Sequence, residues 1–236
     1  MELILSSQSP RRRELLERMG LEFSVLTAEI DETKYETEDP VESVCRICRE
    51  KAYAVAKRLS ADNGQLSTVN CQLVLTADTI VVLDGKIMGK PHDAAEARAM
   101  LRALSGREHA VYTAFTLLPV KMQNAKGKTQ NEATGDGETG PSAPLRFAQD
   151  DMVGAFTHCE KTLVRFRALT EAEIAAYVAT GEPMDKAGAY GIQGRGAMLV
   201  EAIHGDYFTV MGLPVCALAA ALKRYGIDPL EKAGSD

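Results

Sequence analysis

The sequence has no tryptophan, only 6% aromatic residues and a formal net charge of -6. A nucleic-acid-binding module needs basic surface and aromatic stacking platforms, so this composition argues against one. No apolar run approaches the ~20 residues that a membrane-spanning helix requires, and no secretory signal pattern is present. We therefore expect a soluble cytoplasmic protein that binds neither nucleic acid nor membrane.

Cysteine is scarce and odd in number, since the chain has five. A secreted disulfide framework uses an even set in a small domain, so reduced thiols are expected here. Cys45 and Cys48 form a C-x-x-C pattern inside a helical period, but no second pair follows at zinc-ligand spacing. Core packing is therefore favoured over a metal or redox role.

The order of apolar periods indicates a mixed-sheet α/β domain with flanking helices, spanning residues 1–236 as one unit. Strands are predicted at residues 3–5, 23–26, 73–83, 86–88, 109–120, 153–166 and 197–203. Helices are predicted to begin at residues 10, 41, 94, 171 and 214. Residues 121–150 are rich in glycine, threonine, asparagine and proline, which predicts a flexible insertion between two paired strands.

The N-terminal stretch combines a strand, a turn and a helix start. Residues 3–5 are apolar, Ser9 can cap a helix, and Pro10 suits its first position. Arg11 and Arg12 add positive charge where helix N–H groups already favour an anion. This pattern predicts a phosphate site, although arginines that only solvate a helix face remain an alternative.

Two ionisable residues interrupt apolar patterns. Asp78 lies within the nearly continuous apolar run 73–83, where a carboxylate is costly unless it binds a cation or does chemistry. Lys51 projects beside the apolar stripe of the helix that starts at residue 41. An anionic partner would explain this lysine, and so would an ammonium that reaches water past the stripe.

Further polar residues lie at chain reversals. Lys90 follows a predicted hairpin, Glu32 lies in an acidic connection, and the glycine-rich stretch 181–196 carries Lys186 and Gln193. The sequence has no P-loop motif, G-x-x-x-x-G-K-[ST], and no Rossmann motif, G-x-G-x-x-G, that follows a predicted strand. Several cations together with two carboxylates suit a polyphosphate and its divalent metal, with a carboxylate available to activate water.

Several of these segments match longer motifs. They are S-x-S-P-R-R-x-E-L-L from Ser7, A-D-T-I-V from Ala77, G-K-P from Gly89, L-S-G-x-x-H-x-V-x-T from Leu104, D-K-A-G-A-Y-G-I-Q-G from Asp185 and G-L-P from Gly212. In this order they resemble the Maf family of nucleoside triphosphate pyrophosphatases. The resemblance implies a fold similar to that of inosine triphosphate pyrophosphatases, and metal-dependent release of pyrophosphate.

The resemblance also implies residue roles. Asp78 would activate water and, with Glu32, hold a divalent cation such as Mg²⁺, Mn²⁺ or Co²⁺. The substrate-binding residues would be Ser7, Arg11, Arg12, Lys51, Thr79, Lys90, Lys186 and Gln193. We expect a nucleoside triphosphate as the partner, and a homodimer as the assembly.

The family has branches, and three positions distinguish them. Arg12, Thr79 and Gln193 agree with the branch that acts on dTTP and UTP, whereas the 7-methyl-GTP branch has Trp, Gln and Glu there. A glutamine amide can pair with the imide edge of uracil or thymine. Modified pyrimidine nucleotides would also suit the site. The alternatives are a 7-methyl-GTP pyrophosphatase and a non-catalytic nucleotide-binding regulator of cell division.

Overall fold

The computed structural model describes residues 1–28, 30, 38–61, 71–121 and 154–231. Its strands are β1 Glu2–Ser6, β2 Phe23–Val25, β3 Cys71–Leu83, β4 Lys86–Met88, β5 Glu108–Lys121, β6 Phe156–Phe166 and β7 Val200–His204. Its α-helices are α1 Pro10–Arg18, α2 Pro40–Ala61, α3 Ala94–Leu104, α4 Glu171–Ala179, α5 Tyr207–Met211 and α6 Val215–Leu222. Glu32 lies outside the described residues, as does the predicted insertion 121–150 apart from its first residue.

The described strands form one mixed sheet in the order β2-β1-β3-β5-β6-β7, with β4 paired to β3. Strands β1, β2 and β3 run parallel, and the pairings from β3 through β7 are antiparallel. Asp84 and Gly85, both with positive φ, form the tight turn between β3 and β4. The predicted mixed-sheet α/β class is confirmed.

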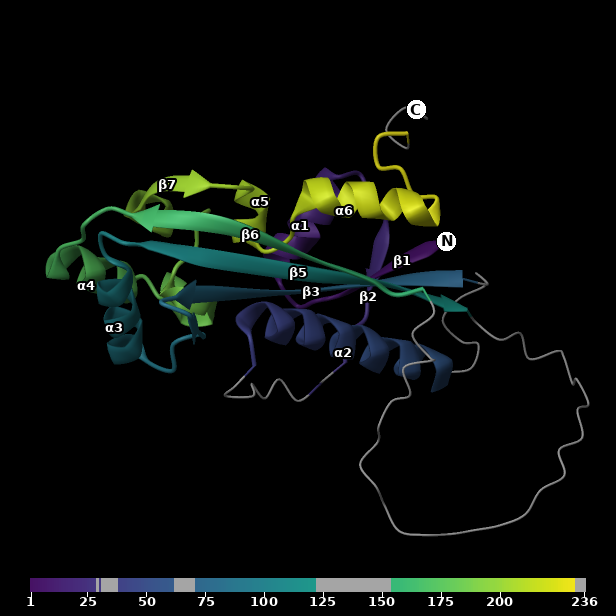
Figure 1. Ribbon diagram of the computed structural model, residues 1–236, viewed down its shortest axis with the longest axis horizontal. Coiled ribbons are helices and arrows are strands. Elements are labelled where there is room, and N and C mark those ends of the chain that lie inside the picture. Colours follow the sequence, from purple (N-terminus) through teal and green to yellow (C-terminus); the bar gives the residue numbers. More distant parts are fainter. Residues whose placement is uncertain (29, 31–37, 62–70, 122–153, 232–236) are drawn as a thin grey trace, which may run out of the picture.

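Helices cover both faces of the sheet (Figure 1). On one face, α2 packs its apolar stripe against the even-numbered residues of β3, such as Val74 and Ile80. On the other face lie two clusters that use the odd-numbered residues: α1, α5 and α6 pack around Leu73 and Leu75, and α3 and α4 pack around Val81. Because both faces of β3 are covered, most of its residues are apolar, with exceptions such as Asp78 and Thr79.

The sheet has an opening beside β3. Strand β1 pairs with β3 up to the Ser6–Thr76 register, and β4 begins to pair only at Val81. Among the described strands, none pairs with residues 77–80 of β3 on this side. A strand edge without a neighbour exposes backbone and side chains from both faces, so functional groups of residues 77–80 can meet in one place.

Most predicted element starts agree with the structure. Asp93 caps α3 by accepting from Glu96 N, and Thr170 and Glu173 form the capping box of α4. The described residues contain no helix long and apolar enough to cross a membrane. The five cysteines are free thiols, and the fully buried Cys48 donates to the Ala114 carbonyl at 3.2 Å.

Two strand predictions need correction. The strand expected from residue 153 begins at Phe156, and the one expected at 197–203 is Val200–His204. Residues Arg195–Leu199 form a 3₁₀ turn instead, because an alternating apolar pattern does not distinguish one tight turn from a strand start. The short helix α5 was not predicted, although its cap Asp206 accepts from Phe208 N and Thr209 N.

Candidate active site

The opening beside β3 leads into a cleft of about 1330 Å³. All predicted site residues that the structure describes line it: Ser7, Arg11, Arg12, Lys51, Asp78, Thr79, Lys90, Lys186 and Gln193. They come from the β1–α1 turn, α2, β3, the segment after β4 and the glycine-rich loop. The cleft therefore gathers segments that are far apart in the chain, while the roles of these residues stay predictions.

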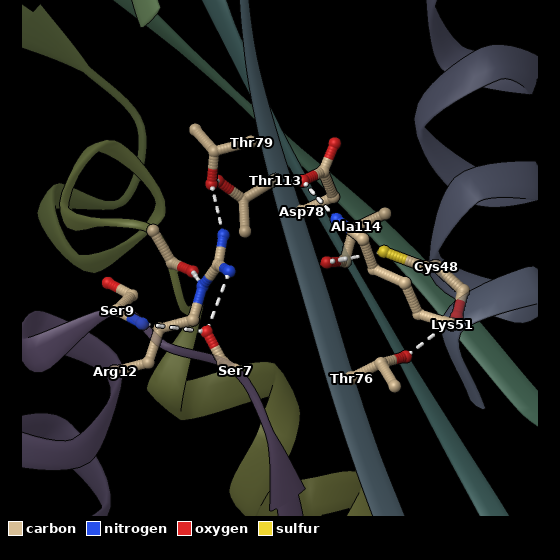
Figure 2. Close-up of polar contacts among 11 residues, drawn as sticks. Ser7, Ser9, Arg12, Cys48, Lys51, Thr76, Asp78, Thr79, Thr113 and Ala114 are labelled. Atoms are coloured by element: carbon tan, nitrogen blue, oxygen red, sulfur yellow. Dashed lines mark hydrogen bonds and ion pairs between the residues drawn. The ribbon is translucent and has the colours of Figure 1, made fainter. Parts of the chain in front are cut away.

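Asp78 and Lys51 meet on the α2 face of the cleft. Lys51 Nζ lies 3.1 Å from Asp78 Oδ1, and the two side chains are 16% and 20% exposed. The period of α2 places Lys51 one turn after the buried Cys48, which points the lysine toward β3 (Figure 2). The ammonium thus has an anionic partner and does not simply reach water past the stripe. The pair holds a carboxylate in the cleft at a partly desolvated position.

Arg12 lies on the opposite face and joins three segments (Figure 2). Its guanidinium donates to Gly212 O at 2.8 Å, to Ser7 Oγ at 3.1 Å and to Thr79 Oγ1 at 3.2 Å. Three directed bonds fix the plane of the group, which a solvated arginine would not need. The neighbouring Arg13 is exposed, as expected for the solvated face. Of Arg12 and Arg13, therefore, only Arg12 lines the cleft.

The adjacent residues Asp78 and Thr79 point to opposite faces of β3. Asp78 faces Lys51 on α2, and Thr79 faces Arg12 on α1 (Figure 2). This follows from the two-residue period of a strand. Because no described strand pairs with β3 here on the side opposite β5, both side chains still line the same cleft.

The glycine-rich loop is tied down by an acid that the sequence patterns did not single out. Glu182 accepts from Arg195 N at 2.9 Å and Gly196 N at 3.2 Å, and from the Tyr177 hydroxyl at 2.9 Å. Tyr177 also accepts from Gly191 N at 3.2 Å. Burial alone would raise the pKa of Glu182, but these donors outweigh it, so the pKa lies below its usual value. A charged carboxylate therefore anchors the loop that carries Gln193.

Glycine is required in this loop by close approach. A Cβ on Gly194 would lie 2.5 Å from Glu182 Oε2, and one on Gly196 would lie 2.4 Å from Gly191 O. A side chain at position 196 would require the backbone to move, and one at position 194 would displace the Glu182 carboxylate. Glycine at positions 194 and 196 thus leaves the space in which the Glu182 carboxylate and the loop backbone make their contacts.

Lys186 has protein partners in the structure. Its ammonium donates to Glu182 O at 2.7 Å and to Asp185 Oδ1 at 2.6 Å. Burial by itself would raise the pKa of Asp185. The hydrogen bond from Lys186 and the charges of Lys186 and Arg11 lower it by more than that, so the pKa lies below its usual value and the acid is ionised. Asp185 was missed as a cleft residue. An acid directly before a lysine in a glycine-rich loop was the available signal.

Asp78 and its surroundings fit a hard divalent cation in part. Mg²⁺ commonly uses one or two carboxylates together with substrate phosphate oxygens and water, so one carboxylate on the cleft wall is compatible with it. The described residues contain no group of three or more metal-ligating side chains. The second predicted ligand, Glu32, lies outside the described residues and stays a prediction.

A mixed-sheet α/β protein whose cleft holds a carboxylate among several cations is typical of enzymes that handle phosphorylated ligands. The chain belongs to the family described as Maf-like protein, whose model matches residues 2–139 and 142–225. It is 43% identical over 227 residues to a dTTP/UTP pyrophosphatase of Moorella thermoacetica, covering 96% of each chain. It is 40% identical to a dTTP/UTP pyrophosphatase of Bacillus cereus, covering 96% of this chain and 97% of the relative.

Proposed function

We propose that this chain is a nucleoside triphosphate pyrophosphatase that acts on dTTP and UTP, releasing pyrophosphate and the monophosphate. Relatives with that name at 40–43% identity over nearly the whole chain support the activity. The observation that carries the proposal is the Lys51–Asp78 pair, which presents a carboxylate in a cleft lined by further cations. A carboxylate so placed can orient and deprotonate a water that attacks phosphorus.

The phosphate end of the substrate would lie against the β1–α1 turn. Ser7 Oγ accepts from Ser9 N at 3.2 Å and from Arg12 Nη1 at 3.1 Å, so its own hydrogen is available to a phosphate oxygen. Arg11, Lys51 and Lys90 line the same cleft and would neutralise phosphate charge. Asp78, with Glu32, would hold the divalent cation, which supplies charge neutralisation at the reacting phosphate.

The base would be selected by Arg12, Thr79 and Gln193. The Gln193 amide can donate and accept in one plane, which suits the imide edge of uracil or thymine. Arg12 and Thr79 are bonded to each other, and both line the cleft, as Gln193 does. Lys186 would contribute to substrate binding from the loop that carries Gln193, and a homodimer is the proposed assembly.

A triphosphate panel tests this proposal. The protein is incubated with Mg²⁺ or Mn²⁺ and with dTTP, UTP, dCTP, dATP, dGTP or 7-methyl-GTP, and pyrophosphate is measured. We expect release from dTTP and UTP, and its loss when a chelator removes the metal. Turnover of 7-methyl-GTP without turnover of dTTP or UTP would overturn the substrate assignment. Binding of dTTP without any pyrophosphate release would instead support a non-catalytic regulator.

A further inference from the structure

A row of hydrogen bonds extends from Arg12 through Thr79 and Thr113 (Figure 2) to the backbone of Thr209 in α5. Arg12 Nη2 lies 3.2 Å from Thr79 Oγ1, which lies 2.9 Å from Thr113 Oγ1 on the neighbouring strand β5. Thr113 Oγ1 in turn lies 2.7 Å from the backbone oxygen of Thr209 in α5. Thr113 is fully buried. It lies where the two apolar clusters of this face meet, and it ends the L-S-G-x-x-H-x-V-x-T motif.

The chemistry of these groups fixes the direction of every hydrogen bond in the row. A carbonyl oxygen only accepts, so Thr113 must donate its single hydrogen to Thr209 O. Thr113 is then left with lone pairs, so Thr79 must donate to Thr113. Arg12 only donates, so Thr79 accepts from it. The hydroxyl hydrogen of Thr79 therefore points into the protein.

The remaining lone pair of Thr79 is the group that faces the cleft. Thr79 lines the cleft and is half-buried, and no other residue in the described part of the chain is bonded to its Oγ1. Ser7, bonded to the same guanidinium, has the opposite polarity, since it accepts twice and keeps its hydrogen. One arginine thus lies between a hydroxyl that can donate to the ligand and one that can only accept from it.

We propose that Thr113 is a positioning residue that keeps Thr79 an acceptor toward the substrate, so that the site selects a ligand with a donor at that point. This inference rests on the proposed function and extends it to a group that does not touch the substrate. The imide N–H of uracil or thymine can only donate, and cytosine replaces it by an acceptor, so the base is the part of a pyrimidine nucleotide whose donor an acceptor-only Thr79 can select. A sugar hydroxyl can donate or accept, so it would bond to Thr79 in either orientation.

The test compares Thr113→Val with wild type for three substrates: dTTP, dCTP and the dTTP analogue without a 3′-hydroxyl. Valine has the shape of threonine but accepts no hydrogen bond, so the Thr79 hydroxyl can turn and donate to the ligand. We expect kcat/KM for dTTP to fall. We also expect the preference for dTTP over dCTP to shrink by about tenfold, as for one hydrogen bond. The ratio of dTTP to the analogue without a 3′-hydroxyl should stay near its wild-type value, because a sugar hydroxyl can also accept from a turned Thr79.

The chain offers a matched control. Thr116 lies on the same strand and is also fully buried, but its hydroxyl is 2.9 Å from Thr157 Oγ1 and away from the cleft. Thr116→Val should lower the melting temperature while leaving both ratios unchanged. Thr113→Ser retains the hydroxyl and should restore the wild-type ratios. Thr113→Cys supplies a weaker acceptor if the valine variant does not fold, and should change the same ratio to a smaller extent.

The positioning role is overturned if Thr113→Val changes the preference for dTTP over dCTP by less than about twofold, or if Thr116→Val changes it equally. Failure of the proposed function gives a different result, since wild type would then release pyrophosphate from none of the three nucleotides. In that case the same ratios are taken from dissociation constants, which report the donor preference without turnover.

Discussion

Asp78 is a partly buried carboxylate whose desolvation costs free energy and whose chemistry the proposed function uses. Its neighbours along β3 are largely buried, and a carboxylate there is tolerated because Lys51 lies 3.1 Å away. A partly desolvated pair of this kind contributes little net stability, since desolvation opposes attraction. In the proposed function the value of this residue is chemical, because it places in the cleft a carboxylate that can act as a base.

Changing Asp78→Asn tests that role. The amide keeps the size of the side chain but cannot accept a proton, so we expect kcat for dTTP to fall by roughly 10³-fold, within the range for general bases. The dissociation constant of dTTP should change by less than about tenfold, since binding depends mainly on the cations. The measurements are steady-state turnover and calorimetric binding.

Asp84→Asn is the control for this change. Asp84 is exposed in the β3–β4 turn and pairs with Arg107, outside the proposed machinery. The Asp84→Asn variant should keep kcat for dTTP within about twofold of the wild-type value. Asp78→Asn with near-normal kcat would remove Asp78 from the mechanism.

At the scale of elements, the β1–α1 unit and the glycine-rich loop both line the cleft. The first is held by regular structure, and Arg12 projects from its helix. The loop has only 3₁₀ turns and depends on Glu182 and Tyr177 for its shape. The backbone on both sides of Gln193 is thus held by Tyr177 and Glu182, which lie more than ten positions earlier in the chain.

Glu182→Gln and Tyr177→Phe test this anchoring. Each removes part of a network that holds Arg195 N, Gly196 N and Gly191 N. A hydrogen bond to a charged group contributes about 1.5–3 kcal/mol, so we expect KM for dTTP to rise roughly tenfold or more with a smaller change in kcat. Steady-state kinetics give both parameters.

Glu171→Gln serves as the comparison, because Glu171 is exposed on α4 and pairs with Arg102. Its KM should stay near wild type. Should Glu182→Gln lower only kcat, the loop would act in the chemical step and not in holding the base.

Element boundaries show what the sequence could and could not predict. Pro10, Asp93 and the Thr170 capping box identified helix starts, because caps and proline act through local hydrogen bonds and a fixed φ. Helix α5 was missed because five residues give no usable period. The start of β7 was misplaced because its position depends on pairing with β6, a long-range contact.

The stability of the whole molecule should depend on pH through His109. This ring is 3% exposed among Phe166 and Tyr190, and burial lowers its pKa from 6.5 to about 4. Between pH 4 and pH 6.5, His109 is therefore protonated in the unfolded chain and neutral in the folded chain. Stability from this group is complete above pH 6.5 and is lost as the pH falls toward 4.

We expect the wild-type free energy of unfolding to be roughly 2 kcal/mol lower at pH 5 than at pH 7.5 because of His109. His109→Gln should remove most of this difference, although it lowers stability at both pH values. Urea denaturation at the two pH values measures it. His92→Gln, at an exposed position, should retain the wild-type difference. An unchanged pH dependence in His109→Gln would show that other groups cause it.

The sequence by itself determined the mixed α/β class, most elements of the chain and the residues proposed for the cleft. These depend on local periods, caps and motifs, which act between near neighbours. Only the tertiary structure decided that Lys51 pairs with Asp78, and that Arg12 lies between Ser7 and Thr79. It also decided which groups Glu182 and Thr113 contact. The physical reason is that a hydrogen bond's partner and direction depend on what lies across the strand or the loop, and residues up to 200 positions apart meet there.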